Sequence, residues 1–399
     1  MTTSDLTLGL RARWSLLAMF FIMGISSMAW VPRIPEVKAN LGLSDGQFGL
    51  LLAASSVGSV IGAQISGGFV HRFGSKNVLR VSQIIMPLGV LIMGVFLSVP
   101  GLLVGLFTMG FGYAAMDIAA NSQAVVAEKL SKKKFLASLH GAWSIGTFGT
   151  ALIGASLAAF VTPKWNLIVM AIIAPIIFVP LTEMLLPKER DEHIGEKGSK
   201  SRIPWFGGKV GILWLFAFGS LGSFVAEGAS MDWGGILLAE HMGVPFGLTA
   251  TVFASFAAAM IISRFTADNF MEKYGAYVTV RYIGMGGAVL WAVGIWVGIA
   301  LHETQPIVAM LAINSGFFAA GLAIGPMFPA FIVGAANIDG VPPSLAIARI
   351  GVISIAGYFV GPTVTGFISE LTSLPIALMY PAAMLLIAGY LGRILKPAN

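Results

Sequence analysis

The sequence predicts an all-α membrane protein whose twelve membrane-spanning helices form two six-helix halves, with both termini in the cytoplasm. Of its 399 residues, 57% are hydrophobic and only 11% are charged, whereas an average soluble domain is about 25% charged. Long apolar segments recur along the chain, and one long polar stretch divides them near the middle. So few charges cannot cover the surface of a soluble protein of this size, which excludes an ordinary soluble enzyme and a disordered chain.

The membrane-spanning helices are predicted from segment length, because a helix needs about 20 mostly apolar residues to cross a bilayer. In the first half of the chain, these segments are 14–31, 46–70, 78–98, 101–127, 139–161 and 165–186. In the second half, they are 210–232, 247–268, 278–301, 305–334, 344–368 and 374–395. Pro326 and Pro329 remove backbone donors inside the tenth segment, so we expect a kink there. Glycines in the fifth and eleventh segments are expected to allow close helix packing.

A polar connection separates the two halves. Residues 187–208 mix charges with Gly and Ser, which predicts a cytoplasmic linker between an N-terminal bundle, 1–186, and a C-terminal bundle, 209–399. Equivalent loops of the two halves also resemble each other, since HRFGSKNVLR at 71–80 and EKYGAYVTVR at 272–281 share a basic–aromatic–Gly run and a final Arg at an offset of 201 residues. We therefore expect two parallel six-helix repeats.

The orientation follows from the basic residues. Nearly all of the 24 Lys and Arg residues, with Arg264 counted among them, fall on one side of the predicted spans. Only Arg33, Lys38 and Lys164 fall on the other side, and Arg349 lies inside the eleventh span. Because cytoplasmic loops are rich in Lys and Arg, both termini are predicted to be cytoplasmic.

Several chemistries have no support in the sequence. There is no cysteine, which excludes disulfides, thiolate metal sites and cysteine nucleophiles, and the five histidines show no metal-ligand spacing. No phosphate-binding loop is present, so ATP is not expected to drive the protein directly. The basic residues are not clustered as a nucleic-acid partner would require. We expect no cofactor and no metal, and a monomer whose partners are the lipid bilayer, a small-molecule substrate and protons.

The loop after the second span carries a family resemblance. Its run from Gly67 to Lys76, GGFVHRFGSK, resembles the G-x-x-x-D-R-x-G-R-K signature of the major facilitator transporters, with His71 in place of the Asp and Ser75 in place of the second Arg. The resemblance covers essentially the whole chain and implies the twelve-helix facilitator fold. It also implies gating roles for residues of this loop, of its counterpart in the second half and of the eleventh helix, namely Gly67, His71, Arg72, Gly74, Lys76, Asp268 and Arg349.

A narrower resemblance lies in the fourth span. The run from Met116 to Ser122, MDIAANS, is similar to L-E-T-A-A-N-P of the fucose–proton symporter branch, which puts Asp117 on the titrating Glu and Asn121 on the Asn. It implies proton coupling at Asp117 but not fucose recognition, because no acidic residue lies near the end of the first span. The run EGASMDW at 227–233 resembles uncharacterised bacterial permeases of this group, which implies the inner plasma membrane of a bacterium.

Ionisable residues inside the spans are the mechanistic candidates, because each costs roughly 2.5–3.5 kcal/mol to insert. Asp117 and Glu227 are the candidates for proton coupling, although either could be a structural carboxylate and Glu227 could accept a hydrogen bond from the substrate. Helical spacing puts Asp117 and Glu128 on one face. Arg33 and Asp232 lie at the outer ends of two symmetry-related helices and are interpreted as a gate pair or as two independent interfacial charges.

Aromatic and amide side chains in the spans suit a sugar-like solute. The candidate cavity residues are Asn121, Trp30, His140, Trp143, Asn314 and Tyr358. Trp30 could instead belong to an interfacial aromatic belt. Together these features predict a secondary active transporter that takes up a small polar solute by alternating access with proton coupling. A proton-coupled exporter of drugs or metabolites, and a solute sensor that does not transport, are the alternatives.

Overall fold

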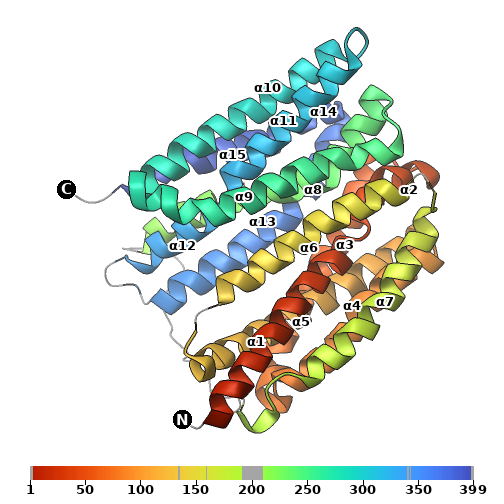
Figure 1. Ribbon diagram of the computed structural model, residues 1–399. Coiled ribbons are helices and arrows are strands. Elements are labelled where there is room, and N and C mark those ends of the chain that lie inside the picture. Colours follow the sequence, from red (N-terminus) through yellow and green to blue (C-terminus); the bar gives the residue numbers. More distant parts are fainter. Residues whose placement is uncertain are drawn as a thin grey trace. The chain divides into compact units, whose positions relative to one another are not determined.

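A computed structural model describes residues 3–133, 135–158, 160–190, 210–338, 341 and 343–396, and every regular element in them is helical (Figure 1). In the first half these elements are α1 (Thr3–Ser27), η1 (Val31–Arg33), α2 (Ile34–Asn40), α3 (Asp45–Phe73), α4 (Ser75–Val95), α5 (Val99–Ser131), α6 (Leu136–Leu157), α7 (Pro163–Glu183) and η2 (Lys188–Arg190). In the second half they are α8 (Val210–Met242), α9 (Phe246–Val278), η3 (Thr279–Ile283), α10 (Gly284–Leu301), α11 (Pro306–Ile324), α12 (Met327–Ala336), α13 (Pro343–Leu371), α14 (Leu374–Ala377), α15 (Met379–Leu391) and η4 (Gly392–Leu395).

The chain forms two compact units. The first comprises residues 1–42 and 51–200, and the second comprises residues 43–50 and 201–399. The predicted linker, 187–208, lies mostly outside the described residues. The assignment of 1–186 and 209–399 as two bundles therefore stays a prediction.

In the first unit, α1 packs against α5, α6 and α7, and α4 packs against α5 and α7. Glycines allow the closest of these approaches. A Cβ added at Gly146 of α6 would lie 2.1 Å from the carbonyl oxygen of Phe21 in α1, and one added at Gly24 would lie 2.3 Å from that of Trp143. The backbones of α1 and α6 therefore touch along a seam where no side chain fits.

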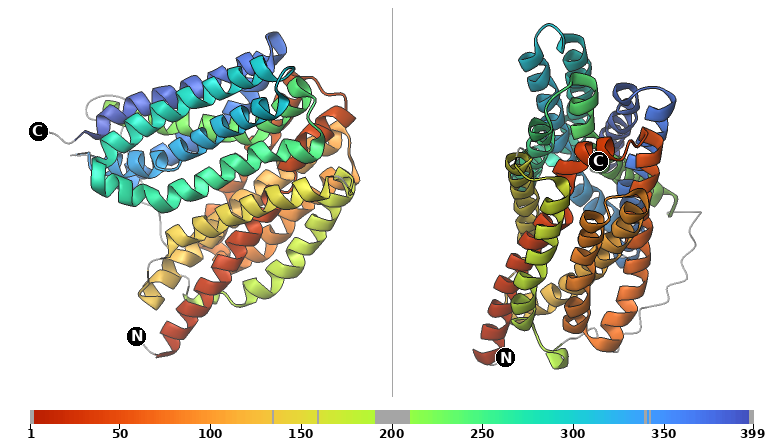
Figure 2. Two further views of the ribbon diagram at one scale, coloured as in Figure 1. Left: turned by 45° about the horizontal axis from the view of Figure 1, so that its top comes forward. Right: turned by 90° about the vertical axis from the view of Figure 1, so that its right-hand side faces the viewer.

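In the second unit, α8 packs against α13, α15 and α9, while α10 packs against α11 and α15. Figure 2 shows the antiparallel pair α10 and α11, coloured teal to blue, side by side in both views. The predicted kink in the tenth span is confirmed, because α11 ends at Ile324 and α12 begins at Met327. Pro326, which has no N–H to donate, lies in the break. The Ser263 hydroxyl donates to the Leu322 carbonyl oxygen (2.7 Å) beside it.

Many large apolar side chains lie on the outer faces of both units. On α4 and α5 they include Val81, Ile84, Leu103 and Val104, all exposed. Among the described residues, ten helical segments are long and apolar enough to cross a membrane. Such exposed apolar faces suit contact with lipid.

The two halves share backbone turns at one fixed offset. Gly42 and Gly243 both have φ of 60°, and Gly74 and Gly275 have φ of 84° and 82°. Each pair is 201 residues apart, the offset at which the two loop motifs align. Positive φ strongly favours glycine, and both repeats have glycine at the same two turns. These matched turns support the internal repeat predicted from the sequence, which stays a prediction.

Candidate functional site

The first unit brings Asp117, Asn121 and His140 together. Asp117 lies on α5, one helical turn before Asn121, whose amide donates to the Asp117 backbone oxygen (2.9 Å). His140, on the neighbouring helix α6, interacts electrostatically with the Asp117 carboxylate. The His140 ring also meets Phe20 of α1 edge-on, with 5.4 Å between the ring centroids. A carboxylate next to an imidazole gives two groups that can accept or release a proton.

Glu128 has a different role from the one its helical position suggests. Its Oε1 accepts hydrogen bonds from the backbone N–H groups of Phe135 (2.5 Å) and Leu136 (2.8 Å). These donors open helix α6, whose first N–H groups have no partner within the helix. Glu128 therefore caps α6, and the Asp117 cluster does not include it.

Trp30 and Trp143 both lie in the first unit. Trp30 is buried at the junction of α1 and η1, which argues against a lipid-facing aromatic belt for this residue. Trp143 is partly buried on α6, and its indole N–H has no hydrogen-bond partner within the described chain. This indole nitrogen is buried, and the assignment of Trp143 to a solute cavity stays a prediction.

Arg33 is fully buried in the first unit. Its Nη2 lies 2.6 Å from Oε2 of Glu36 and donates to the Val161 carbonyl oxygen (2.7 Å). Asp232 belongs to the second unit, where it is partly buried and forms no hydrogen bond or ion pair with any described residue. The Arg33–Asp232 gate pair remains a prediction.

In the second unit, Glu227 of α8 forms an ion pair with Arg264 of α9 (3.6 Å from Oε1 to Nη2). The distribution of basic residues predicts a place for Arg264 on the cytoplasmic side, but it lies well within helix α9. The signal that could have found it was its position inside the predicted span 247–268. Its acidic partner could not be read from spacing, because the two residues lie on different helices.

Asn314 and Tyr358 are held by contacts within the second unit. The Asn314 amide accepts from the Ser255 hydroxyl (2.9 Å) and donates to the Met310 carbonyl oxygen (2.8 Å), which joins α9 to α11. The Tyr358 hydroxyl donates to the Met231 sulfur (3.3 Å). Their predicted contacts with a solute would have to coexist with these bonds or replace them.

The predicted gating residues of the loop between α3 and α4 lie at the ends of these helices. Gly67 faces open space, and the Arg72 guanidinium lies 5.1 Å from the centre of the Phe73 ring. His71 is partly buried, and Gly74 makes the turn that begins α4. In the second unit, Asp268 is exposed on α9 and Arg349 is buried on α13.

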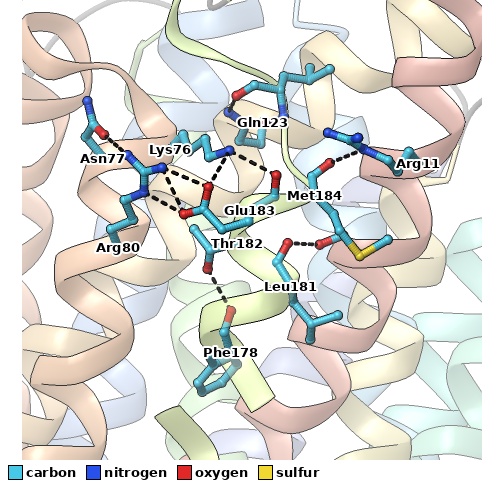
Figure 3. A network of polar contacts seen from close by, with 12 residues as sticks. Arg11, Lys76, Asn77, Arg80, Gln123, Phe178, Leu181, Thr182, Glu183 and Met184 are labelled. Atoms are coloured by element: carbon cyan, nitrogen blue, oxygen red, sulfur yellow. Dashed lines mark hydrogen bonds and ion pairs between the residues drawn. The ribbon is translucent and has the colours of Figure 1, made fainter. Parts of the chain in front are cut away.

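A polar network ties this loop to the end of α7 (Figure 3). Arg80 donates through two nitrogens to the Glu183 carboxylate (2.9 Å each), and Lys76 lies 3.3 Å from the same carboxylate. The buried Gln123 amide donates to the Ser75 hydroxyl (2.8 Å) and accepts from the Leu186 N–H (3.0 Å). Sequence reasoning missed Gln123 and Glu183, because neither belongs to the loop motif.

Comparison with known proteins places the chain in a family. Residues 16–340 match the Major Facilitator Superfamily. An uncharacterised transporter of this type from Yersinia pestis is 27% identical over 368 residues, covering 92% of this chain and 91% of the relative. The structure of a D-xylose–proton symporter superposes with a TM-score of 0.72 at 15% identity, over 98% of both chains. That of the nucleoside transporter NupG superposes with a TM-score of 0.73 at 12% identity, over 97% of this chain and 100% of NupG.

These structural neighbours share the fold, and the family match extends over most of the sequence. The family resemblance seen in the loop after the second span is therefore confirmed over most of the chain. The protein is a multi-pass membrane transporter rather than an enzyme, and it belongs to the Major Facilitator Superfamily.

Proposed function

We propose that the protein is a proton-coupled secondary transporter that takes up a small polar solute by alternating access. The observation that carries the proposal is the Asp117 cluster, in which a carboxylate on α5 interacts with His140 on α6. A carboxylate inside an apolar helix is costly, and carboxylates and histidines in such positions are typical of proton pathways in membrane proteins. The D-xylose–proton symporter with the same fold supports this assignment, and it also supports a sugar-like solute.

We also propose that the protein is a monomer in the inner membrane of a bacterial cell. In this proposal the chain crosses the membrane twelve times and both termini lie in the cytoplasm. Of the ten candidate segments, Phe246–Leu301 has 56 residues and contains the turn at Gly275, so it supplies two spans. Helix α6, with 22 residues, is long enough to supply another. The distribution of Lys and Arg supports the orientation.

The test is uptake into proteoliposomes with and without an imposed pH gradient. Because Asp117→Asn removes the titrating group but keeps its size, we expect this variant to lose accumulation driven by the gradient, at least tenfold, while exchange of solute across the membrane persists. Glu303→Gln is the matched control, because this carboxylate is 85% exposed in a loop. Unchanged accumulation by Asp117→Asn would refute the coupling role.

The same experiment separates the alternatives. Accumulation with an acidic exterior indicates uptake, and accumulation with an acidic vesicle interior indicates export. Saturable binding without movement of solute under either gradient would instead identify a sensor.

A further inference from the structure

We propose that the transported solute carries a carboxylate group and that Arg264 binds this group, with Glu227 as the counter-ion that the solute replaces. The inference rests on the proposed transport function and adds the chemical class of the solute. It starts from the ion pair Glu227–Arg264, which joins the long apolar helices α8 and α9.

Both charges lie far from the helix ends. By helical rise, Glu227 is about 25 Å from Val210 and about 22 Å from Met242, the two ends of α8. Arg264 is about 27 Å from Phe246 and about 16 Å from the turn at Gly275. Arg264 is therefore not a loop residue that fixes the topology, and its charge needs another reason.

Arg264 lies on the internal face of α9 and is nevertheless accessible. Phe253, Ala257 and Met260 precede it at helical spacing on the same face, and each is only 3% exposed. The Arg264 side chain is 30% exposed, whereas its partner Glu227 is 8% exposed. The cation is thus the more accessible member of the pair, and the carboxylate lies behind it.

The fold itself does not require this pair. At the offset of 201 residues fixed by Gly42 and Gly243, and by Gly74 and Gly275, Arg264 corresponds to Ala63 of α3. In α1, the counterpart of α8, the sequence has Asp5 as its single acidic residue, in the first turn. At the same offset Glu227 corresponds to Ser26, so the first half has no charge at either of the two equivalent positions. A neutral apolar pair would often be as stable as a buried ion pair, so a structural explanation is weak.

The contact with Glu227 is also one that a solute can replace. It joins one nitrogen to one oxygen at 3.6 Å, which is longer than the roughly 2.7–2.9 Å of a charge-assisted hydrogen bond. A guanidinium matches a carboxylate best in a planar, two-pronged geometry, and the contact with Glu227 does not have this geometry. A solute carboxylate that adopts this geometry would compete with Glu227 for Arg264.

The test measures binding to the purified full-length protein with pairs of solutes that differ in the carboxylate. The probes are D-gluconate with D-glucose, lactate with propane-1,2-diol, and benzoate with benzyl alcohol, each followed by calorimetry. We expect a carboxylate to bind more tightly than its neutral counterpart. Arg264→Gln should weaken its binding about tenfold to hundredfold, as expected for the loss of a charged hydrogen-bonded contact.

Two variants keep the test interpretable. Arg80→Gln is the matched control, because it removes an arginine paired with a glutamate in the network around Glu183, and we expect unchanged binding. If Arg264→Gln alone fails to fold because Glu227 is left unpaired, the double variant Glu227→Gln/Arg264→Gln removes both charges. It should fold and should also lose the preference for the carboxylate.

Equal binding of neutral and carboxylate probes, or a preference that survives in the double variant, would overturn the inference. Uptake assays separate this result from failure of the proposed function. Saturable uptake of a neutral solute that Arg264→Gln leaves unchanged would support transport and refute the carboxylate assignment. Carboxylate binding that depends on Arg264 without any uptake would support the assignment and refute transport.

Discussion

Two arginines that are wholly or partly buried lie against groups that offset part of the cost of burial. Arg33 contacts Glu36 and a backbone carbonyl, and Arg264 contacts Glu227. Asp232 differs, because it has no such partner in the described part of the chain. An unpaired charge costs roughly 2.5–3.5 kcal/mol in hydrocarbon. Binding of a proton, a solute or another side chain to the Asp232 carboxylate would therefore stabilise the protein by offsetting this cost.

The neutral side chain of Gln123 is expected to contribute more to the stability of the protein than the exposed ion pairs near it. Its buried amide forms hydrogen bonds with the Ser75 hydroxyl and with the backbone N–H and carbonyl groups of Leu186. Because Gln123→Ala would leave these groups unsatisfied, we expect a loss of about 2–3 kcal/mol of stability, seen as a lower thermal unfolding midpoint in detergent.

Glu183→Gln is the comparison for that experiment, because it breaks the nearby ion pairs with Arg80 and Lys76. The Glu183 side chain is 54% exposed, and exposed ion pairs contribute at most about 1 kcal/mol. The unfolding midpoint should therefore fall less than in Gln123→Ala. A larger fall for Glu183→Gln would contradict this account of the network.

Candidate functional residues could be predicted from the sequence, but the residues with which they interact could not. Asp117 stands out because it is a carboxylate in an apolar span, but its electrostatic interaction with His140 depends on how α5 and α6 lie. Glu128 follows Asp117 at helical spacing, yet it caps α6 because α6 begins close to it after the turn. Spacing along one helix indicates which side chains share a face, but it does not indicate which helix packs against that face.

At the scale of elements, helix α6 contains one glycine that is needed for helix packing and another that is not. A Cβ at Gly146 would meet the Phe21 carbonyl oxygen at 2.1 Å, whereas one at Gly149 would have nothing within 4 Å. The sequence presents both as glycines of one span. Only the packing of α1 on α6 tells them apart.

We therefore expect opposite effects from the same substitution at these two positions. Gly146→Ala should force α1 and α6 apart and destabilise the protein by about 1–3 kcal/mol. Gly149→Ala should be neutral or stabilising by up to about 1 kcal/mol, because alanine is the better helix former. Thermal unfolding in detergent measures both, and equal destabilisation by the two variants would show that the seam is not tightly packed.

At the scale of the whole molecule, the two halves repeat their turns but not their charges. The repeat was predictable, because the glycines that require positive φ recur in the sequence at the same offset, as Gly74 and Gly275 do. The polar residues differ between the halves, since the Asp117 cluster lies in the first and the Glu227–Arg264 pair in the second. We therefore assign the turns that occur in both halves to the fold. We assign the charged residues that occur in only one half to function.

The proposed topology can be tested because the chain has no cysteine. Any cysteine introduced becomes the only thiol of the protein, so labelling reports a single site. Val99 and Glu303 lie in loops predicted to face outward, and Lys133 and Lys273 lie in loops predicted to face the cytoplasm. All four residues are exposed, so a thiol at each should react with a maleimide that reaches it.

We expect a membrane-impermeant maleimide added to intact spheroplasts to label Val99→Cys and Glu303→Cys at once. Lys133→Cys and Lys273→Cys should react only after lysis, because the bilayer shields loops on the cytoplasmic side. If one half had one span fewer or one span more, every loop after that point in the chain would lie on the opposite side of the membrane. Its labelling pattern would then be reversed. Labelling of Lys273→Cys in intact spheroplasts would therefore refute the twelve-span topology, and labelling of Lys133→Cys would locate the error in the first half.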